Sequence, residues 1–234
     1  MVFILLILPL AAVPLLAQEG EATSWETIKQ QAEEHYGPDQ DLLNGKKYNY
    51  TYRSAEGNPF FEVHGDLLSS IQIKGKVYKG QKLRFDIYNQ LLVLDFTDLS
   101  GATGSIILRD DWVGFFTQGQ LLFRKYPDKQ GRLRYGQVVH EGEYSCIYFW
   151  KKEYIPELRD GESYFSFSEA DWDAMIIREG KAMAYKNRGS FLKCFPKEDR
   201  GRIKSYLRTE EIKVHKVSDS KMEQVMQTIN EGRL

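Results

Sequence analysis

Residues 70–96 read SIQIKGKVYKGQKLRFDIYNQLLVLDF, and this stretch decides the fold class. Apolar residues recur at alternate positions, which is typical of strands that bury one face. The dipeptides Lys79-Gly80 and Asn89-Gln90 stand where two-residue turns would close hairpins, since Gly80 and Asn89 tolerate positive φ. The stretch therefore predicts three antiparallel strands in direct succession. In the first we expect Ile71, Ile73, Gly75 and Val77 on one face and Gln72, Lys74, Lys76 and Tyr78 on the other, and in the second Leu83, Phe85 and Ile87 opposite Lys82, Arg84, Asp86 and Tyr88.

The composition of the 234-residue chain is that of a globular protein. Aromatic residues make up 13%, and the excess of Tyr and Phe suits a β-rich interior. The chain carries 32 basic and 33 acidic residues, which are interspersed and form no basic stripe. This charge pattern argues against nucleic acid as a partner.

Residues 1–17, MVFILLILPLAAVPLLA, contain no charged side chain and are followed at once by polar residues. This pattern predicts a secretory signal peptide that is cut after Ala17, although the n-region lacks Lys and Arg and Leu15 is large for the −3 position. The alternative is a membrane anchor, but a span needs about 20 apolar residues and Pro9 and Pro14 interrupt this run. No later stretch predicts a transmembrane span in the mature chain.

Residues 18–234 predict a single domain of mainly β (α+β) class. An N-terminal helix is expected within residues 18–40, because Thr23 and Glu26 form a capping-box pattern. Residues 45–187 predict antiparallel strands joined by close turns, which favours one long meander that forms a curved sheet, a sandwich or an open barrel. Beyond residues 70–96, the expected strands are 105–109, 112–117, 120–126, 133–140, 143–152, 163–167 and 181–186, with a Pro156-containing loop over 152–161.

Residues 188–234 predict two short helices that follow a helical turn, SFLKCF. Pro196 suits the first turn of a helix that runs to about Leu207. Ser218 begins the last helix, whose apolar stripe should pack on the sheet. The residues of that stripe are Met222, Val225, Met226 and Ile229.

The two cysteines, Cys146 and Cys194, leave two alternatives open. In an exported protein they could form a disulfide, which would close a loop of about 50 residues and stabilise the fold by roughly 4 kcal/mol. However, Cys146 lies in the strand-like run YSCIYFW, where a buried thiol is the simpler expectation. We favour the buried thiols.

Three tyrosines, Tyr48, Tyr50 and Tyr52, share one face of the strand expected over KKYNYTYR. They are candidate ligand-binding residues, because exposed aromatic rings in a row can form a stacking platform for sugars. The other interpretation, which we favour, is a core face whose hydroxyls reach the rim.

A second candidate is the acidic run around a tryptophan, Asp171-Trp172-Asp173, which Ser168 and Glu169 precede. Carboxylates so close together could bind calcium or act as an acid–base pair on a sugar. The spacing does not complete a calcium loop. We favour a capped helical turn that begins at Ser168, with acidic residues near its N-terminus.

Other catalytic signatures are not found in the sequence. The histidines His35, His64, His140 and His215 show no i, i+4 spacing, so no zinc motif is predicted. No G-x-S-x-G nucleophile motif occurs, and the glycine-rich residues 101–105 lack the lysine of a phosphate loop. The sequence therefore predicts no catalytic residues, no metal and no cofactor.

The order of motifs resembles a group of uncharacterised exported β-rich proteins of Bacteroidota-type bacteria. The resemblance covers DLLNGKKY, GNPFF, KGKVYKG with LRFDIYNQLLVL, and the tail GSFLKCFPKEDRGRIKSYLR. It implies export to a Gram-negative envelope, either to the periplasm or to the outside. It carries over no functional residues.

Three functions remain open at this stage. The first is a non-catalytic exported envelope protein, a binding or structural β-domain, whose partner could be an envelope protein. The second is a periplasmic carrier that holds an apolar ligand in a curved-sheet cavity. The third is a hydrolase that uses carboxylates gathered from loops. We favour the first, because no catalytic constellation supports an enzyme.

Overall fold

The computed structural model of the chain describes residues 39–62, 68–98, 100–159 and 162–233. The expected signal peptide and, apart from residues 39 and 40, the expected N-terminal helix lie outside the described residues, as do His35 and His64. None of the helices in the described ranges is long and apolar enough to cross a membrane.

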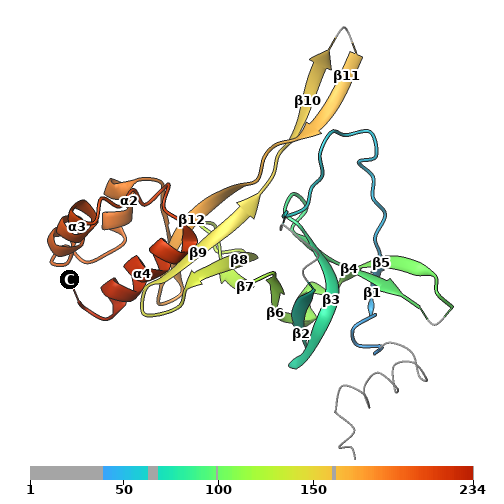
Figure 1. Ribbon diagram of the computed structural model, residues 1–234, viewed down its shortest axis with the longest axis horizontal. Coiled ribbons are helices and arrows are strands. Elements are labelled where there is room, and N and C mark those ends of the chain that lie inside the picture. Colours follow the sequence, from blue (N-terminus) through green and yellow to red (C-terminus); the bar gives the residue numbers. More distant parts are fainter. Residues whose placement is uncertain (1–38, 63–67, 99, 160–161, 234) are drawn as a thin grey trace, which may run out of the picture. The chain divides into compact units, whose positions relative to one another are not determined.

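Most of the strands form one antiparallel sheet, which confirms the predicted mainly β fold. Its 11 strands run in the order β1-β5-β4-β3-β2-β6-β7-β8-β9-β12-β13, and β10 and β11 form a separate two-stranded ribbon (Figure 1). The sheet is open, because β1 and β13 are its two ends. The strands are β1 Gly45–Lys47, β2 Ser69–Ile73, β3 Lys76–Asp86, β4 Leu91–Thr97, β5 Thr103–Leu108, β6 Val113–Gln118, β7 Leu121–Pro127, β8 Leu133–His140, β9 Ser145–Lys151, β10 Tyr154–Arg159, β11 Glu162–Phe167, β12 Asp171–Arg178 and β13 Lys181–Tyr185.

The first hairpin of residues 70–96 turns at a different dipeptide from the one predicted. Lys74 and Gly75, both with positive φ (48° and 84°), form the two-residue turn between β2 and β3. Because the turn falls five residues earlier, Tyr78 is buried and Val77 is 44% exposed, the reverse of the predicted faces. The sequence offers two Lys-Gly dipeptides, and local turn chemistry does not distinguish them.

Gly80, the glycine of the second Lys-Gly pair, lies within β3 at a bulge. Its φ is +69°, and the register to β2 shifts between the Ile71–Tyr78 and Ser69–Gln81 pairs. Before the bulge β3 pairs with β2, and after it β3 pairs with β4 through residues 82–86. A bulge bends a strand and increases its twist, so β3 makes a corner here.

The corner rolls the sheet so that distant strands touch. Four strand steps separate β3 from β8, which would be roughly 19 Å in a flat sheet. Nevertheless, the ring centroids of Phe85 on β3 and Tyr135 on β8 are 5.8 Å apart. In addition, the Gln118 side chain on β6 donates a hydrogen bond to the Leu83 carbonyl on β3 at 3.1 Å. The open, curved sheet is therefore filled from within.

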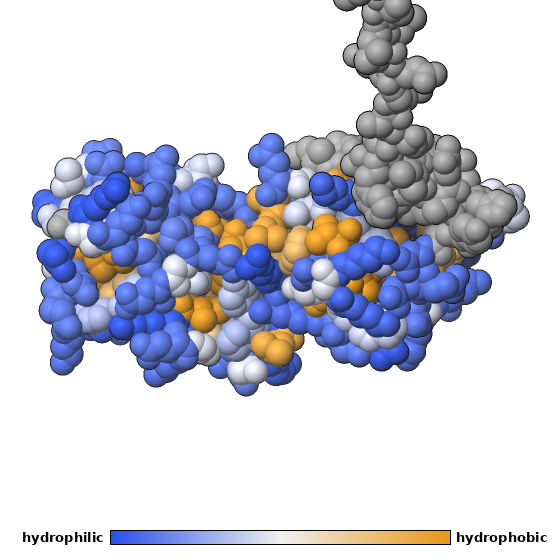
Figure 2. Space-filling view, turned by 90° about the horizontal axis from the view of Figure 1, so that it is seen from below, coloured by the Kyte–Doolittle hydropathy of each residue, from blue (hydrophilic) through white to orange (hydrophobic). Residues whose placement is uncertain are grey.

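Two main cores result, one in each half of the sheet, and a smaller third cluster lies on the other face of β9 and β12. In the curled half, strands β1–β7, the core consists of strand residues such as Phe85, Phe116 and Phe123, all 0% exposed. In the covered half, strands β8, β9, β12 and β13, the core lies between one sheet face and the C-terminal helices. In Figure 2, the region in which Figure 1 places α2, α3 and α4 is mostly hydrophilic. Hydrophobic residues gather toward the middle of the face shown in Figure 2.

Three helices follow the sheet, one more than the two predicted. They are α2 Arg188–Lys193, α3 Arg200–Thr209 and α4 Asp219–Asn230. The predicted helical turn SFLKCF overlaps α2. Asn187 and Ser190 form a capping box at the N-terminus of this helix. The helix expected from Pro196 begins at Arg200. The last helix is confirmed: Ser218 caps it, and its predicted apolar stripe is buried.

Two other segments differ from the prediction. Residues 152–161, predicted as a loop, contain strand β10, which accommodates Pro156 because a ribbon strand does not need every N–H. Residues 168–173, predicted as a capped helical turn, lead into strand β12 instead. Met175, Ile176 and Ile177 are all buried, so the strand is covered on both faces and shows no alternating pattern.

Candidate functional site

The six residues proposed from the sequence fall in two separate places. Tyr48, Tyr50 and Tyr52 follow β1 in a segment without regular secondary structure, because β1 ends at Lys47 rather than continuing through residue 52. Their side chains still share one side, since all three are half-buried while the residues between them are exposed. The shared face is confirmed, whereas the expected strand is wrong.

The tyrosine rings serve as packing surface. Tyr52 meets Tyr154 and Phe167 of the ribbon at ring distances of 5.3 and 5.1 Å, and Tyr50 stacks on Phe60 at 6.4 Å. Burial, and then the nearby charge of Asp86, raises the pKa of Tyr48 to about 12, so this hydroxyl stays protonated. The contacts favour the core interpretation over a sugar platform.

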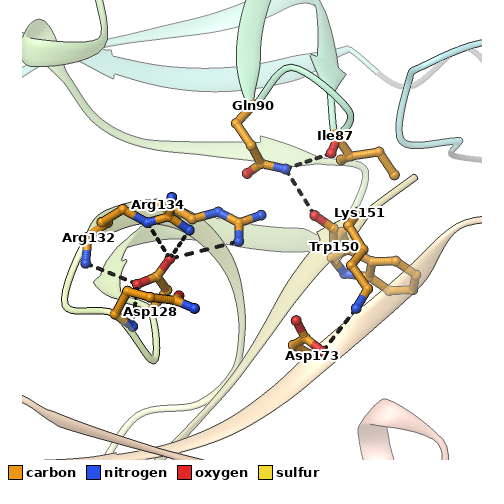
Figure 3. A network of polar contacts seen from close by, with 9 residues as sticks. Ile87, Gln90, Asp128, Arg132, Arg134, Trp150, Lys151 and Asp173 are labelled. Carbon is orange, nitrogen blue, oxygen red and sulfur yellow. Dashed lines mark hydrogen bonds and ion pairs between the residues drawn. The ribbon is translucent and has the colours of Figure 1, made fainter. Parts of the chain in front are cut away.

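Asp171 and Asp173 lie on one face of β12, and Trp172 lies on the other. Lys151 on the neighbouring strand β9 forms an ion pair with Asp173 at 3.0 Å (Figure 3) and another with Asp171 at 3.7 Å. Burial lowers the pKa of Lys151, but the hydrogen bond that Lys151 donates to Asp173 and the charges of the two carboxylates outweigh it and raise this pKa above its usual value. The two carboxylates therefore neutralise a lysine, and together with Trp172 they line a hollow of about 300 Å³ beside residues 184–186 and 214–215.

Trp172 also lines a pocket on the opposite sheet face. It pairs directly across the strands with Trp150 of β9, and their ring centroids are 4.9 Å apart. The two tryptophans and their neighbours enclose about 390 Å³. We call this cavity the tryptophan pocket; its walls are Phe61, Leu121, Tyr148, Trp150, Ala170, Trp172 and Val217, with Glu62, Lys152, Glu169 and Asp219 as charged lining residues.

The pocket lies where the two cores meet. Phe61 packs on Phe123 of the curled half at 5.4 Å and on Trp150 at 4.9 Å. Val217 and Asp219 come from the start of α4 and the chain just before it. A site formed by both halves has walls that are held by two separate sets of contacts, which is where small-molecule pockets are often found.

A buried amide fixes two walls of the pocket relative to each other. Gln137 on β8 is 1% exposed. Its Oε1 accepts the indole N–H of Trp150 at 2.7 Å, and its Nε2 donates to Oδ2 of Asp219 at 2.6 Å. A satisfied buried network of this kind holds its members in one arrangement. Gln137 therefore sets both the tilt of the Trp150 ring and the place of the Asp219 carboxylate.

Among the described lining residues of the pocket, the one basic side chain is already compensated. The Lys152 side chain is 5% exposed, and its Nζ donates to Oε1 of Glu62 at 3.1 Å and to the Asn58 carbonyl at 3.0 Å. The lining thus carries three carboxylates against one ammonium group. Burial raises the pKa of Tyr148, so this wall is a neutral phenol. The local charge of the pocket is negative.

Other candidate chemistry finds no support in the described residues. Over the described ranges, no group of three or more His, Cys, Asp and Glu side chains could hold a metal ion. Cys146 and Cys194 are free, buried thiols, and burial raises their pKa to about 12 and about 11. Thiols with such pKa values stay protonated at neutral pH and are poor nucleophiles. The expectation of buried thiols is confirmed.

The sequence indicated one member of the pocket and missed the rest. Trp172 was a candidate because of its acidic neighbours, which point to the other face. Trp150 and Lys152 lie in the run that predicts a strand, and a strand pattern does not reveal which partner lies opposite. Gln137 carried a signal of its own, because a polar residue amid the apolar positions of a strand needs a buried partner.

Comparison with known proteins gives no match to a protein family, to a curated protein or to a solved structure. The geometry of the pocket is therefore the basis for the function proposed below.

Proposed function

We propose that this chain is a non-catalytic binding domain that takes a small ligand in the tryptophan pocket. The observation that carries the proposal is the pocket itself, a cavity of about 390 Å³ with aromatic walls and a few fixed polar groups. This combination is typical of small-molecule sites, in which apolar walls supply affinity and polar groups supply orientation. Its volume lies near the lower end of such sites, which favours a small ligand.

The carrier alternative has less support, because the interior of the curled sheet is filled by side chains. Phe116 and Phe123 stack at 4.9 Å, and Phe85 packs against both at 5.3 and 5.6 Å. Rings at these distances are in van der Waals contact. A lipid-like ligand would have to displace this core.

The hydrolase alternative also has less support, because the acidic pairs are engaged in ion pairs. Asp171 and Asp173 share Lys151. Asp110 pairs with Lys125 at 2.9 Å, and Asp111 pairs with Arg109 at 3.1 Å, which lowers the pKa of Asp111. A catalytic acid needs a raised pKa, which is the opposite of what Arg109 does to Asp111.

The place of this binding domain is proposed to be the envelope of a Gram-negative bacterium. The support is the leader-like stretch over residues 1–17 and the resemblance to exported proteins. Mass spectrometry of the protein from its own host tests this: a mature chain that begins after Ala17 supports export, and a chain that retains the leader contradicts it.

The indole N–H resonances in a ¹⁵N spectrum test the binding function directly. The chain has four tryptophans, so the resonances can be assigned by single substitutions. Mixtures of neutral sugars, small carboxylic acids, organic cations and aromatic molecules are added in turn. We expect at least one class to shift Trp150 and Trp172 and to leave Trp112, which contacts Lys74 at another place, unchanged.

The matched control pair is Trp172→Ala and Trp112→Ala. Trp172 is 38% exposed, so its loss should leave the fold intact, while binding should weaken at least ten-fold. Trp112→Ala should bind normally. If no class of molecule shifts Trp150 and Trp172, or if binding survives Trp172→Ala unchanged, the pocket is not the site.

A further inference from the structure

We propose that the ligand of the tryptophan pocket is a small organic cation of the alkylated ammonium class. This inference rests on the proposed function and adds the chemistry of the ligand. Three features of the pocket carry it: the inclination of its rings, the charge of its described lining residues, and the absence, in the described part of the chain, of a cation that lies over those rings.

The aromatic walls are inclined to one another. Trp150 and Trp172 are tilted by 47°, Phe61 and Trp150 by 61°, and Tyr148 and Trp172 by 32°. Since neighbouring rings touch at an angle (centroids 4.9 to 5.8 Å apart), they form one bent aromatic wall, which follows a rounded group more closely than a flat sugar ring. The negative faces of such rings attract a cation, and Trp attracts it most strongly.

The charged groups of the lining favour the same ligand. Glu62, which binds Lys152 at 3.1 Å, offsets the ammonium group found among the described lining residues. Asp219 and Glu169 then leave the pocket negative. Gln137 holds Asp219 in place through its 2.6 Å hydrogen bond, so this carboxylate is positioned before a ligand arrives. A fixed negative charge beside aromatic rings is complementary to an organic cation and repels an anion.

Elsewhere in this chain, cations already lie over aromatic rings. The ammonium group of Lys74 is 3.6 Å from the ring centroid of Trp112, and the Arg84 guanidinium is 4.5 Å from that of Phe60. Among the contacts of this kind in the described residues, none involves Phe61, Tyr148, Trp150 or Trp172. The pocket rings are thus open to a cation from outside.

Choline and its neutral isostere 3,3-dimethylbutan-1-ol are the probes that test this inference, because they differ in charge and hardly in shape. Titration is followed by the indole N–H resonances of Trp150 and Trp172. We expect choline to bind about ten-fold more tightly than the alcohol, which is the scale of a desolvated cation–π contact. Trp172→Phe should retain part of the preference, and Trp172→Ala should lose it.

Asp219→Asn separates charge from shape, since asparagine can still accept the hydrogen bond from Gln137. We expect this variant to reduce the preference for choline over the alcohol, and Trp112→Phe to leave it unchanged. If the alcohol or a neutral sugar binds as well as choline, the cation inference is wrong while the binding function stands. If neither choline, the alcohol nor any other class tested shifts the pocket resonances, both proposals fall.

Discussion

The two halves of the sheet bury similar strands in different ways. In the curled half, the bulge at Gly80 turns β3 from one partner strand to another, and the sheet covers its own apolar face. In the covered half, α2, α3 and α4 lie over the equivalent face of β8, β9, β12 and β13. The difference shows that one antiparallel sheet can obtain its core either from its own curvature or from added helices.

The difference also explains where the pocket lies. The self-covered core ends at Phe61 and Phe123, and the helix-covered core begins at Val217 and Asp219. Neither the curvature of the sheet nor the C-terminal helices cover the sheet face around Trp150 completely. A hollow therefore remains at the junction, and its walls come from both halves.

The test with the largest expected effect on stability truncates one core side chain in each half. Phe85→Ala should lower the free energy of unfolding by about 3–5 kcal/mol, and Leu207→Ala in α3 by about 2–5 kcal/mol, because both side chains are fully buried. Since β7 and β8 pair over five residue positions, we expect a single cooperative transition that both variants shift. Chemical denaturation followed by tyrosine fluorescence and circular dichroism measures this.

Two separate transitions, each moved by only one of the variants, would contradict this expectation. The halves would then fold independently, and the double variant would show strictly additive changes. In that case the pocket would be an interface between two folding units rather than part of one core.

The next test removes the buried amide of Gln137, which ties β9 to α4 beside the pocket in the covered half. Gln137→Leu leaves the indole N–H of Trp150 and the carboxylate of Asp219 without their buried partner. We expect a loss of about 1–3 kcal/mol in the free energy of unfolding, the usual cost of unpaired buried polar groups. The Trp150 indole resonance should also move, because it loses its acceptor. If the variant has the same spectrum and the same free energy of unfolding as the original chain, the hydrogen bonds of Gln137 do not hold the pocket in its shape.

A substitution at Gly80, where β3 bends, should have a smaller effect on the free energy of unfolding. A side chain at φ +69° is strained whatever space surrounds it, so Gly80→Ala should destabilise the chain by about 1–2 kcal/mol. The control is Gly201→Ala in α3, where nothing lies within 4 Å of the added carbon and helix propensity favours alanine. This variant should stabilise by up to about 0.5–1 kcal/mol. Equal effects of the two substitutions would mean that the bulge is not needed for the curl.

These elements also show how far the sequence could predict the fold. The period of two predicted β4 and β6–β9 to within a few residues, and the stripe over residues 222–229 predicted α4, because these patterns are local. The choice between Lys74-Gly75 and Lys79-Gly80 depends on which residues face the core, and Tyr78 on the buried side decides it only in the folded chain. The sequence did not predict strand β12, because a strand that is covered on both faces shows no alternation of apolar and polar residues.

The sequence predicts the pocket less well than it predicts the fold. Its walls come from residues 61–62, 121, 148–152, 169–172 and 217–219, which only the strand order brings together. The sequence proposed Trp172 together with Asp171 and Asp173, but adjacent residues in a strand point to opposite faces. An accurate pairing of β9 with β12 would have placed Trp172 opposite Trp150 and separated the two aspartates.

The smallest expected effect concerns the turn between β7 and β8, the strands at which the two halves join. Asp128 accepts hydrogen bonds from the backbone N–H groups of Gln130 and Arg132 and from the Arg132 guanidinium at 2.9 Å (Figure 3). Burial raises the pKa of Asp128, but these hydrogen bonds outweigh burial and lower it below its usual value of 3.8. The folded state therefore favours the carboxylate, which stabilises the chain above about pH 4 and loses this contribution as the pH falls through the lowered pKa.

Asp128→Asn keeps the acceptor oxygen for the turn and removes the charge. Because the Arg132 side chain is 67% exposed, we expect a loss of at most about 1 kcal/mol at pH 7. The difference between the original chain and the variant should shrink as the pH falls below 4 and through the lowered pKa of Asp128, because both side chains then become neutral. Urea denaturation at pH 7, 5, 4 and 3 measures it. A difference that stays constant over this range would assign the effect to the shape of the turn, and the joint between the halves would then depend on backbone geometry alone.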